Sequence, residues 1–310
     1  MTHLEVVTPG VQTLIQDLGR FGVGHIGLSQ GGPADLHAYC WANRLLGNDS
    51  RAPVLEITLG QVAFKAKQNV MLAVTGANMP LSIDGQPVEN WQTLWLEKGQ
   101  VLKFGYARQG FRCYLAIESG FDVPRWFGSA STVVRNGIGG LENEPGRALS
   151  KGDELTSVLK HHTMRPSQAV ASRYVGQYPS NIRLGVLETY QHTLFSEQQK
   201  AMFYQSAYTV SDKTDRMGVR LQGRAIHPAQ NGVISEGIAP GSIQFPANGQ
   251  PIILSNDRQT LGGYPKLGCL SKMSLMRLGQ ARPGVEIEFY PTDLAQERLA
   301  YRQFAQFFGL

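Results

Sequence analysis

The chain has 310 residues, enough for two hydrophobic cores or one large core. Its hydrophobic fraction of 42% and charged fraction of 17% are those of an ordinary globular protein. The net charge of +5 is small for this length, and no run of Lys and Arg with interleaved aromatic residues occurs, which argues against nucleic acid binding. No apolar run approaches the roughly 20 residues that span a bilayer, so we expect no membrane partner.

The N-terminal sequence and the cysteines indicate the expected compartment. The first ten residues, MTHLEVVTPG, have neither the basic nor the apolar segment of a secretory signal. Cys40, Cys113 and Cys269 are far apart and odd in number, which favours reduced, buried cysteines over a disulfide or a metal set. We therefore expect a cytoplasmic protein with no metal site.

The first half of the chain is predicted to contain many short strands and one helix. Residues 33–46 (PADLHAYCWANRLL) follow helical spacing, and Pro33 suits the first helical position. After Pro53 the apolar residues alternate with period two, and the Asp84-Gly85 pair between two apolar runs predicts a hairpin. Short strands at regular spacing, together with 35 glycines, favour a barrel or sandwich over a doubly wound parallel sheet.

The sequence predicts two domains, residues 1–160 and 181–310, joined by a linker at 161–180. The linker loses hydrophobic periodicity and carries two prolines and several small polar residues. His161 and His162 lie in this linker and are expected at its surface.

Two helices are predicted in the second half. Residues 195–203 form the first, with Ser196 as N-cap and Gln199 completing a capping box. Residues 291–310 form an amphipathic helix that covers the second core or docks a partner.

The densest group of polar residues follows an apolar run at 251–254 (PIIL). In order, its members are Asn256, Asp257, Arg258, Gln259 and Thr260, followed by Gly262 and Gly263. Polar groups that follow a buried strand are held rigidly and yet exposed by their loop, so this stretch is a candidate site. The alternative is a polar hairpin tip whose glycines only serve the turn.

Motifs along nearly the whole chain, in order, resemble the signatures of one family. In the second half they occupy residues 215–218, 235–237, 240–244, 249–252, 257–260 and 262–265; in the first half, residues 16–20, 32–35, 42–48 and 55–56. These segments are similar to the allophanate hydrolase subunit 2 family, also called biotin-dependent carboxyltransferase-like or KipA-like.

This resemblance implies a fold and a function. It implies a mainly β protein with two cyclophilin-like β-barrel lobes, a few short helices and a C-terminal helix. It also implies one component, the C subunit, of an ATP-dependent 5-oxoprolinase, which cleaves 5-oxoproline to glutamate and uses ATP at the level of the complex. The expected partners are a KipI-like B subunit and a LamB/YcsF-type A subunit, and the expected substrate is a small anion.

Two alternatives stay open within the same family. One is the carboxyltransferase component of a urea carboxylase or allophanate-type system, for which biotin is the implied cofactor. No biotin-attachment segment or ATP-grasp loop is visible, so the chain is not a self-contained carboxylase. The other is a KipA-like regulatory protein that binds a KipI-like kinase inhibitor.

The chain departs from the family pattern at three places. Where the family has a Pro-Gly-Pro turn, this chain has residues 187–191 (LETYQ). Val219 and Gln222 stand where the family has Tyr and Glu, so no role is carried over to these two side chains.

The implied reactions handle planar, anionic acyl groups. Such groups suit a guanidinium fork, backbone donors, and a carboxylate or water that moves a proton. We expect Arg216 and Arg258 to bind the anionic group, and Asp257 and Glu236 to orient them or move protons. Lys266 would add positive charge.

Further substrate contacts are expected from the same loop, namely Gln259, Thr260 and the backbone N–H groups of Gly262 and Gly263. The alternative is that Asp215–Arg216 and Asp257–Arg258 are ion pairs that only fix the rims of the barrel.

Asp17 and Arg20 form a second candidate cluster at a strand end before a glycine-rich loop. The favoured alternative is that Asp17 accepts backbone N–H bonds and only ties down this loop.

Overall fold

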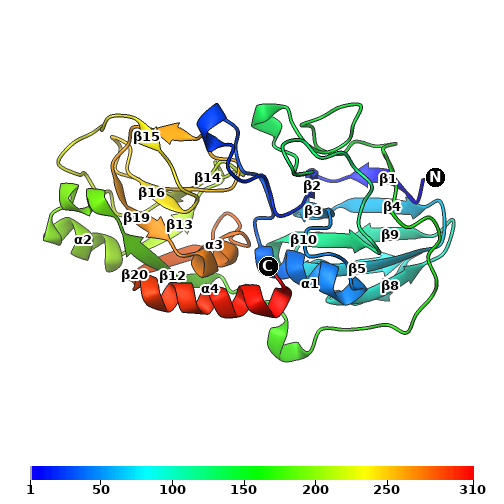
Figure 1. Cartoon of the computed structure of the whole chain (residues 1–310). Coiled ribbons are helices and arrows are strands. Elements are labelled where there is room, and N and C mark those ends of the chain that lie inside the picture. Colours follow the sequence, from blue (N-terminus) through cyan, green and yellow to red (C-terminus); the bar gives the residue numbers. More distant parts are fainter. Residues whose placement is uncertain (1) are drawn as a thin grey trace. The chain divides into compact units, whose positions relative to one another are not determined.

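The computed structural model describes residues 2–310 and is mainly β, as the sequence predicted (Figure 1). The chain forms two compact units, one from Met1–Arg20 and Gly31–Tyr178, the other from Phe21–Gln30 and Pro179–Leu310. The short segment Phe21–Gln30 therefore packs with the second unit although it lies early in the sequence. Each unit has its own hydrophobic core.

The first unit contains two antiparallel sheets. In spatial order, the six-stranded sheet is made of β11 (Glu154–Leu155), β1 (Leu4–Pro9), β4 (Val62–Ala66), β9 (Val101–Phe104), β6 (Leu81–Ile83) and β7 (Gln86–Val88). The five-stranded sheet is made of β2 (Gln12–Gln16), β3 (Val54–Thr58), β10 (Gln109–Ile117), β5 (Val70–Asn78) and β8 (Gln92–Leu96). Inward-facing residues of both sheets, such as Phe64 and Leu115, share one core, as expected for packed sheets.

The predicted hairpin is confirmed. Strands β6 and β7 pair directly across Asp84 and Gly85, whose φ angles are 50° and 83°. Positive φ at both central residues defines the type I′ turn that Asp-Gly favours.

Helix α1 (Leu36–Leu46) packs on the five-stranded sheet, mainly on β5 and β10. The predicted start at Pro33 is wrong, because Asp35 has extended backbone angles and its carboxylate caps the helix by accepting from the Ala38 N–H at 3.2 Å. Gly47 ends the helix in the left-handed conformation, with φ of 68°.

The second unit is built on a closed barrel. Its strands, in spatial order, are β12 (Asn181–Glu188), β19 (Lys266–Leu270), β16 (Ser242–Gln244), β17 (Ile252–Leu254), β14 (Gly218–Gln222), β13 (Ala207–Val210) and β20 (Glu286–Pro291). A two-stranded ribbon of β15 (Glu236–Gly237) and β18 (Leu261–Gly262) lies outside this ring. Figure 1 shows the blue segment Phe21–Gln30 beside β15.

The helices of the second unit are α2 (Glu197–Tyr204), α3 (Lys272–Leu278) and α4 (Leu294–Phe308). Single 3₁₀ turns occur along the chain at Gly24–Ile26, Val134–Asn136, Ser172–Tyr174 and Tyr190–Leu194. The predicted capping box of α2 is confirmed, because Ser196 and Gln199 exchange side chain to backbone hydrogen bonds. Phe203 of α2 stacks on Phe289 of β20 with ring centroids 4.6 Å apart, which closes one side of the core.

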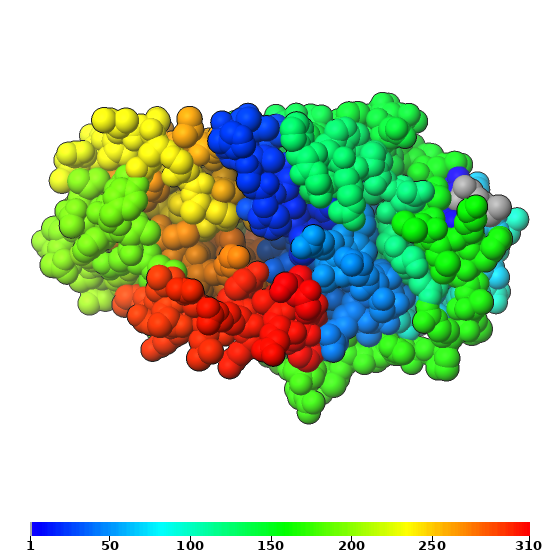
Figure 2. Space-filling model, viewed as in Figure 1, coloured from blue at the N-terminus to red at the C-terminus, as the bar shows by residue number. Residues whose placement is uncertain are grey.

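Helix α4 has no buried residue and lies at the surface along its length (Figure 2). It packs against α3, where Lys272 Nζ lies 4.2 Å from the ring centroid of Tyr301. The helix is shorter than the predicted 291–310, because Pro291 is the last residue of β20 and Asp293 is the N-cap.

The cysteines and the linker histidines were predicted with mixed success. Cys40 and Cys113 are buried, Cys269 is half-buried, and all three are free thiols. The prediction that His162 lies at the surface is wrong: its ring is buried, and Nδ1 lies 3.0 Å from Glu118 Oε2. A segment without hydrophobic periodicity can still bury one side chain by pairing it with a distant carboxylate.

Candidate functional site

The first feature of the site is a buried ion pair between two loops of the barrel. Arg216 precedes β14 and Asp257 follows β17, and the antiparallel pairing of these strands brings the two loops together. Arg216 Nε and Nη2 donate to Asp257 Oδ2 and Oδ1, both at 2.9 Å, and Asp257 N donates to Arg216 O at 3.0 Å. Only 7% of Arg216 and 4% of Asp257 is exposed, so this is a bidentate, desolvated pair.

The alternative predicted ion pairs between sequence neighbours, Asp215–Arg216 and Asp257–Arg258. The structure shows a different pairing. Asp215 is exposed and its carboxylate accepts from the N–H groups of Met217 at 2.8 Å and Gly218 at 3.1 Å. Asp257 pairs with Arg216, 41 residues earlier, and this leaves Arg258 available for another partner.

Arg258 is the second feature. Its Nε donates to the Ile238 carbonyl at 2.8 Å, while Nη1 is buried and has no hydrogen-bond partner within residues 2–310. Burial lowers the pKa of Arg258, because desolvation disfavours the charged form. Ser29, from the early segment that joins this unit, donates to the carbonyls of Asp257 at 3.2 Å and Arg258 at 2.7 Å. The loop is therefore fixed from its backbone while one end of the guanidinium can take an anionic acceptor.

The third feature is the ion pair of Lys266 and Glu236. Lys266 begins β19 and is buried, and its Nζ contacts Glu236 Oε1 on the ribbon strand β15. Gln191 bridges the two, because its Nε2 donates to Glu236 Oε1 at 2.6 Å and its Oε1 accepts from Lys266 N at 2.9 Å. The pKa of Glu236 lies below its usual value. The larger cause is the hydrogen bond from Lys266, and the next is the hydrogen bond from Tyr190.

The ribbon connects these features. Glu236 lies opposite Gly262 in the β15–β18 pairing, and Ile238, just after β15, donates its N–H to Thr260 O at 3.0 Å. A Cβ on Gly262 would lie 2.3 Å from Ile238 Cδ1 and 2.9 Å from Gln244 Nε2, so a larger residue would require the ends of these two side chains to shift. Close approach, and not a positive φ, is what favours glycine here.

Most of the predicted site residues of the second unit are thus neighbours in a single network. Gly263 directly follows the ribbon strand β18, and its carbonyl accepts from the Val233 N–H at 2.8 Å. Gln259 and Thr260 are half-buried in the loop between Arg258 and the ribbon.

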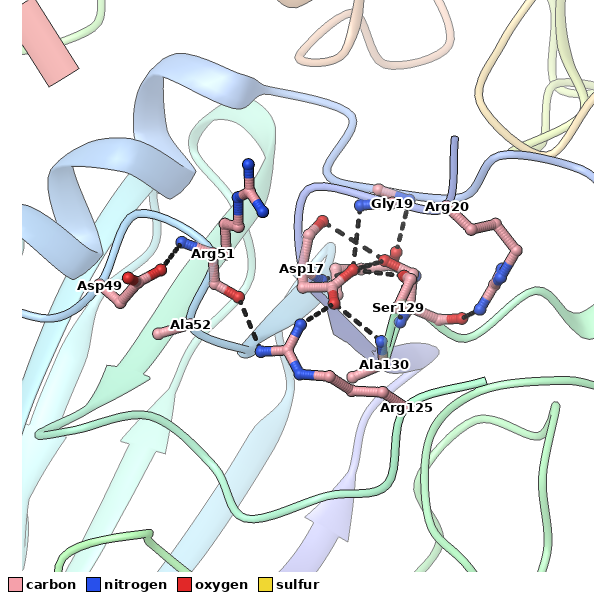
Figure 3. A network of polar contacts seen from close by, with 12 residues as sticks. Asp17, Gly19, Arg20, Asp49, Arg51, Ala52, Arg125, Ser129 and Ala130 are labelled. Atoms are coloured by element: carbon pink, nitrogen blue, oxygen red, sulfur yellow. Dashed lines mark hydrogen bonds and ion pairs between the residues drawn. The ribbon is translucent and has the colours of Figure 1, made fainter. Parts of the chain in front are cut away.

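Asp17 and Arg20 lie in the first unit and form a separate network (Figure 3). The Asp17 carboxylate accepts five hydrogen bonds, from the N–H groups of Gly19 and Ala130, the hydroxyls of Ser129 and Ser131, and Arg125 Nη1. Arg20 is 1% exposed, and its Nη2 donates to the Ser131 carbonyl at 2.5 Å. These bonds have the geometry expected if Asp17 ties down the loop.

Sequence reasoning missed four residues of the second-unit network, namely Ser29, Tyr190, Gln191 and Gln244. Tyr190 and Gln191 lie in the stretch that departs from the family pattern, which was the one available signal for them. Gln244 ends the short strand β16 and lies in the motif at residues 240–244, which gave no indication of a role for its side chain. Ser29 lies more than 200 residues from its partners, so no local pattern marks it.

Within residues 2–310, no group of three or more His, Cys, Asp or Glu side chains is placed to hold a metal ion. The same residues include no helix with the length and apolar character needed to cross a bilayer.

The chain belongs to the carboxyltransferase domain family. The model of that family, which is described as "Carboxyltransferase domain, subdomain A and B", matches residues 26–291. This match confirms the resemblance found in the sequence motifs.

Individual relatives refine this assignment. The chain is 36% identical to the C subunit of 5-oxoprolinase from Escherichia coli strain K12, over 97% of this chain and 94% of that protein. It is 33% identical to the C subunit of 5-oxoprolinase from Haemophilus influenzae, over 94% of this chain and 92% of that protein. The crystal structure of Kluyveromyces lactis urea carboxylase superposes on 99% of this chain with a TM-score of 0.91 and 28% identity. This chain covers only 29% of that longer protein.

Proposed function

We propose that this chain is the C subunit of an ATP-dependent 5-oxoprolinase, which opens 5-oxoproline to glutamate together with a KipI-like B subunit and a LamB/YcsF-type A subunit. The observation that carries the proposal is the end-to-end correspondence with the C subunits of two 5-oxoprolinases, which match this chain over more than nine-tenths of both lengths. The urea carboxylase match, in contrast, covers a minor part of a longer protein.

The site chemistry suits this substrate. 5-Oxoproline carries one carboxylate and one lactam carbonyl. Opening the ring adds a water oxygen to the carbonyl carbon and breaks the C–N bond, and the nitrogen leaves as the amine after gaining a proton. Such a reaction needs an anion-binding group, positive charge near the carbonyl oxygen, and a proton-transfer group.

We assign these roles within the second unit. Arg258, with a buried and unpaired Nη1, binds the substrate carboxylate. Lys266 supplies positive charge to the carbonyl oxygen, and Glu236, its partner on the ribbon, takes part in proton transfer. Arg216 and Asp257 satisfy each other at 2.9 Å, so we assign them to hold the loop that carries Arg258.

The remaining predicted residues have supporting roles in this proposal. Gln259 and Thr260 contact the substrate from the same loop as Arg258, and Gly262 and Gly263 keep the ribbon close to it. Asp17 and Arg20 anchor the turn that leads into the glycine-rich segment.

A second candidate is a biotin-dependent carboxyltransferase component. The TM-score of 0.91 to the urea carboxylase structure favours it, because the whole chain follows that fold. The same cation cluster would then receive a carboxylated nitrogen instead of a lactam.

Reconstitution tests the proposal. The purified chain is mixed with the two partner subunits, and ATP hydrolysis is measured with and without 5-oxoproline. We expect hydrolysis only with all three subunits and substrate, and no turnover by this chain alone. Retention of a biotinylated protein would favour carboxyl transfer. Tight partner binding with no turnover in any combination would contradict the proposal and favour a regulatory protein.

A further inference from the structure

Gln244 is a buried side chain with an unused hydrogen-bond donor. It ends β16 and is 2% exposed, and its Nε2 has no hydrogen-bond partner within residues 2–310. Across the sheet it is paired with Lys266, at a point where the β16–β19 register shifts. A carboxamide in such a place is unusual, because a buried donor without an acceptor is destabilising.

A second buried glutamine, Gln16, provides a comparison, because its side-chain amide has a structural role. Gln16 is fully buried in the first unit, and both ends of its amide are bonded. Its Nε2 donates to the Thr132 carbonyl at 2.9 Å, and its Oε1 accepts from the Gly32 N–H at 3.0 Å. Gln244 has no such use for Nε2, so stability alone does not explain a glutamine at that position.

The unused donors of Gln244 and Arg258 belong to side chains that lie on two sides of Ile238. Ile238 borders both, because its carbonyl accepts from Arg258 Nε at 2.8 Å and its Cδ1 shares with Gln244 Nε2 the space beside Gly262. Arg258 Nη1 is likewise buried and without a partner in the described chain. Two unpaired donors, one neutral and one cationic, therefore flank the same residue.

We propose that Gln244 is a substrate-binding residue whose Nε2 donates a hydrogen bond to the carbonyl oxygen of a small molecule that also carries a carboxylate, the carboxylate going to Arg258. A neutral amide donor suits a carbonyl, and a guanidinium suits a carboxylate. This inference rests on the proposed function and extends it, because it separates the two ends of the substrate.

The substrate reaches Gln244 when the ribbon of β15 and β18 moves away. Each of its strands has only two residues, and Leu261 on it is 61% exposed, so the ribbon is held mainly by the Glu236–Lys266 pair and the Gln191 bridge. A two-stranded ribbon of this kind has low local stability.

The test compares Gln244→Met with Gln16→Met in the full chain assembled with its partner subunits. Methionine keeps the approximate volume and removes the amide. We expect Gln244→Met to keep or raise the Tm, because it removes an unpaired buried donor, and to raise the KM for 5-oxoproline about tenfold. Gln16→Met should lower the Tm by several degrees, because it leaves two buried backbone groups unpaired.

The two readouts separate the possible failures. An equal loss of Tm in both variants, or an unchanged KM in Gln244→Met, overturns the inference. If the wild-type complex does not act on 5-oxoproline, the proposed function fails, and the inference is decided by calorimetric binding of N-acetylglycine, which presents both an amide carbonyl oxygen and a carboxylate. Weaker binding of N-acetylglycine by Gln244→Met than by the wild type would support the carbonyl contact. Equal binding by the two proteins, or no binding by either, would overturn it.

Discussion

Replacing Asp257 by Asn tests whether the buried ion pair is a structural element of the second unit. The change is nearly isosteric, but it removes the carboxylate charge that faces the buried Arg216 guanidinium and turns one acceptor of the bidentate pair into a donor. Both side chains are less than a tenth exposed and both hydrogen bonds are 2.9 Å long, so little solvent screening applies. Breaking a buried pair of this kind costs about 3–5 kcal/mol.

The expected change in Tm follows from the size of the unit. A domain of this length loses roughly 2–4 °C per kcal/mol, so Asp257→Asn should lower the Tm of the second unit by about 6–20 °C. Differential scanning calorimetry measures this shift. The matched control is Asp215→Asn, an exposed neighbour that accepts only backbone N–H bonds and should cost about 1 kcal/mol or less.

A small effect of Asp257→Asn on stability would contradict a structural role of the ion pair. If the free energy of unfolding of Asp257→Asn is within about 1 kcal/mol of the wild-type value, the ion pair does not hold the loop. If it also abolishes 5-oxoproline-dependent ATP hydrolysis, Asp257 acts in the chemistry, and its assignment as a positioning residue is wrong.

Three further predictions concern a cation, a glycine and a histidine. Arg258→Gln should abolish substrate-dependent ATP hydrolysis and leave the Tm within a few degrees, whereas a large loss of Tm would make Arg258 structural. Gly262→Ala should cost about 1–3 kcal/mol, measured by urea unfolding, because its Cβ would lie 2.3 Å from Ile238 Cδ1; unchanged stability would show that the ribbon yields freely. Burial, with the nearby imidazoles of His3 and His161, lowers the pKa of His162 from 6.5 to about 4, so stability should fall as pH drops from about 6.5 to 4. Urea unfolding at pH 7.5 and pH 5 checks this, and a pH dependence that persists in His162→Gln would contradict it.

The direction of the His162 effect follows from its contacts. Glu118 accepts from Nδ1 at 3.0 Å but also pairs with Arg165, so its negative charge is already compensated. Nε2 is buried without a partner in the described residues, and protonation would place a second N–H there with no acceptor. The neutral ring is therefore favoured in the folded state, while the unfolded chain binds the proton more readily.

Local patterns predicted those elements whose causes are local. The Asp84-Gly85 turn and the Ser196 capping box each depend on residues within a few positions, and both form as predicted. The start of α1 failed for a local reason as well, since Asp35 is a better cap than Pro33 is a first helical residue.

The pairing of charges in the site could not be predicted in the same way. The sequence places Asp215 beside Arg216 and Asp257 beside Arg258, but strand pairing brings Arg216 to Asp257. Which charges meet is decided by the register of β14 on β17, and no window of local sequence contains both strands. The same limit hid Ser29, which reaches the loop from the other end of the chain.

Residues 187–191 contribute a bridge to the site. Gln191 uses both ends of its amide, one on the Glu236 carboxylate and one on the Lys266 backbone, so it fixes the distance between the ribbon and β19. The position of the Glu236–Lys266 pair therefore depends on Gln191. Gln191 holds the ribbon that must move to uncover Gln244, which links the strength of the Gln191 bridge to substrate entry.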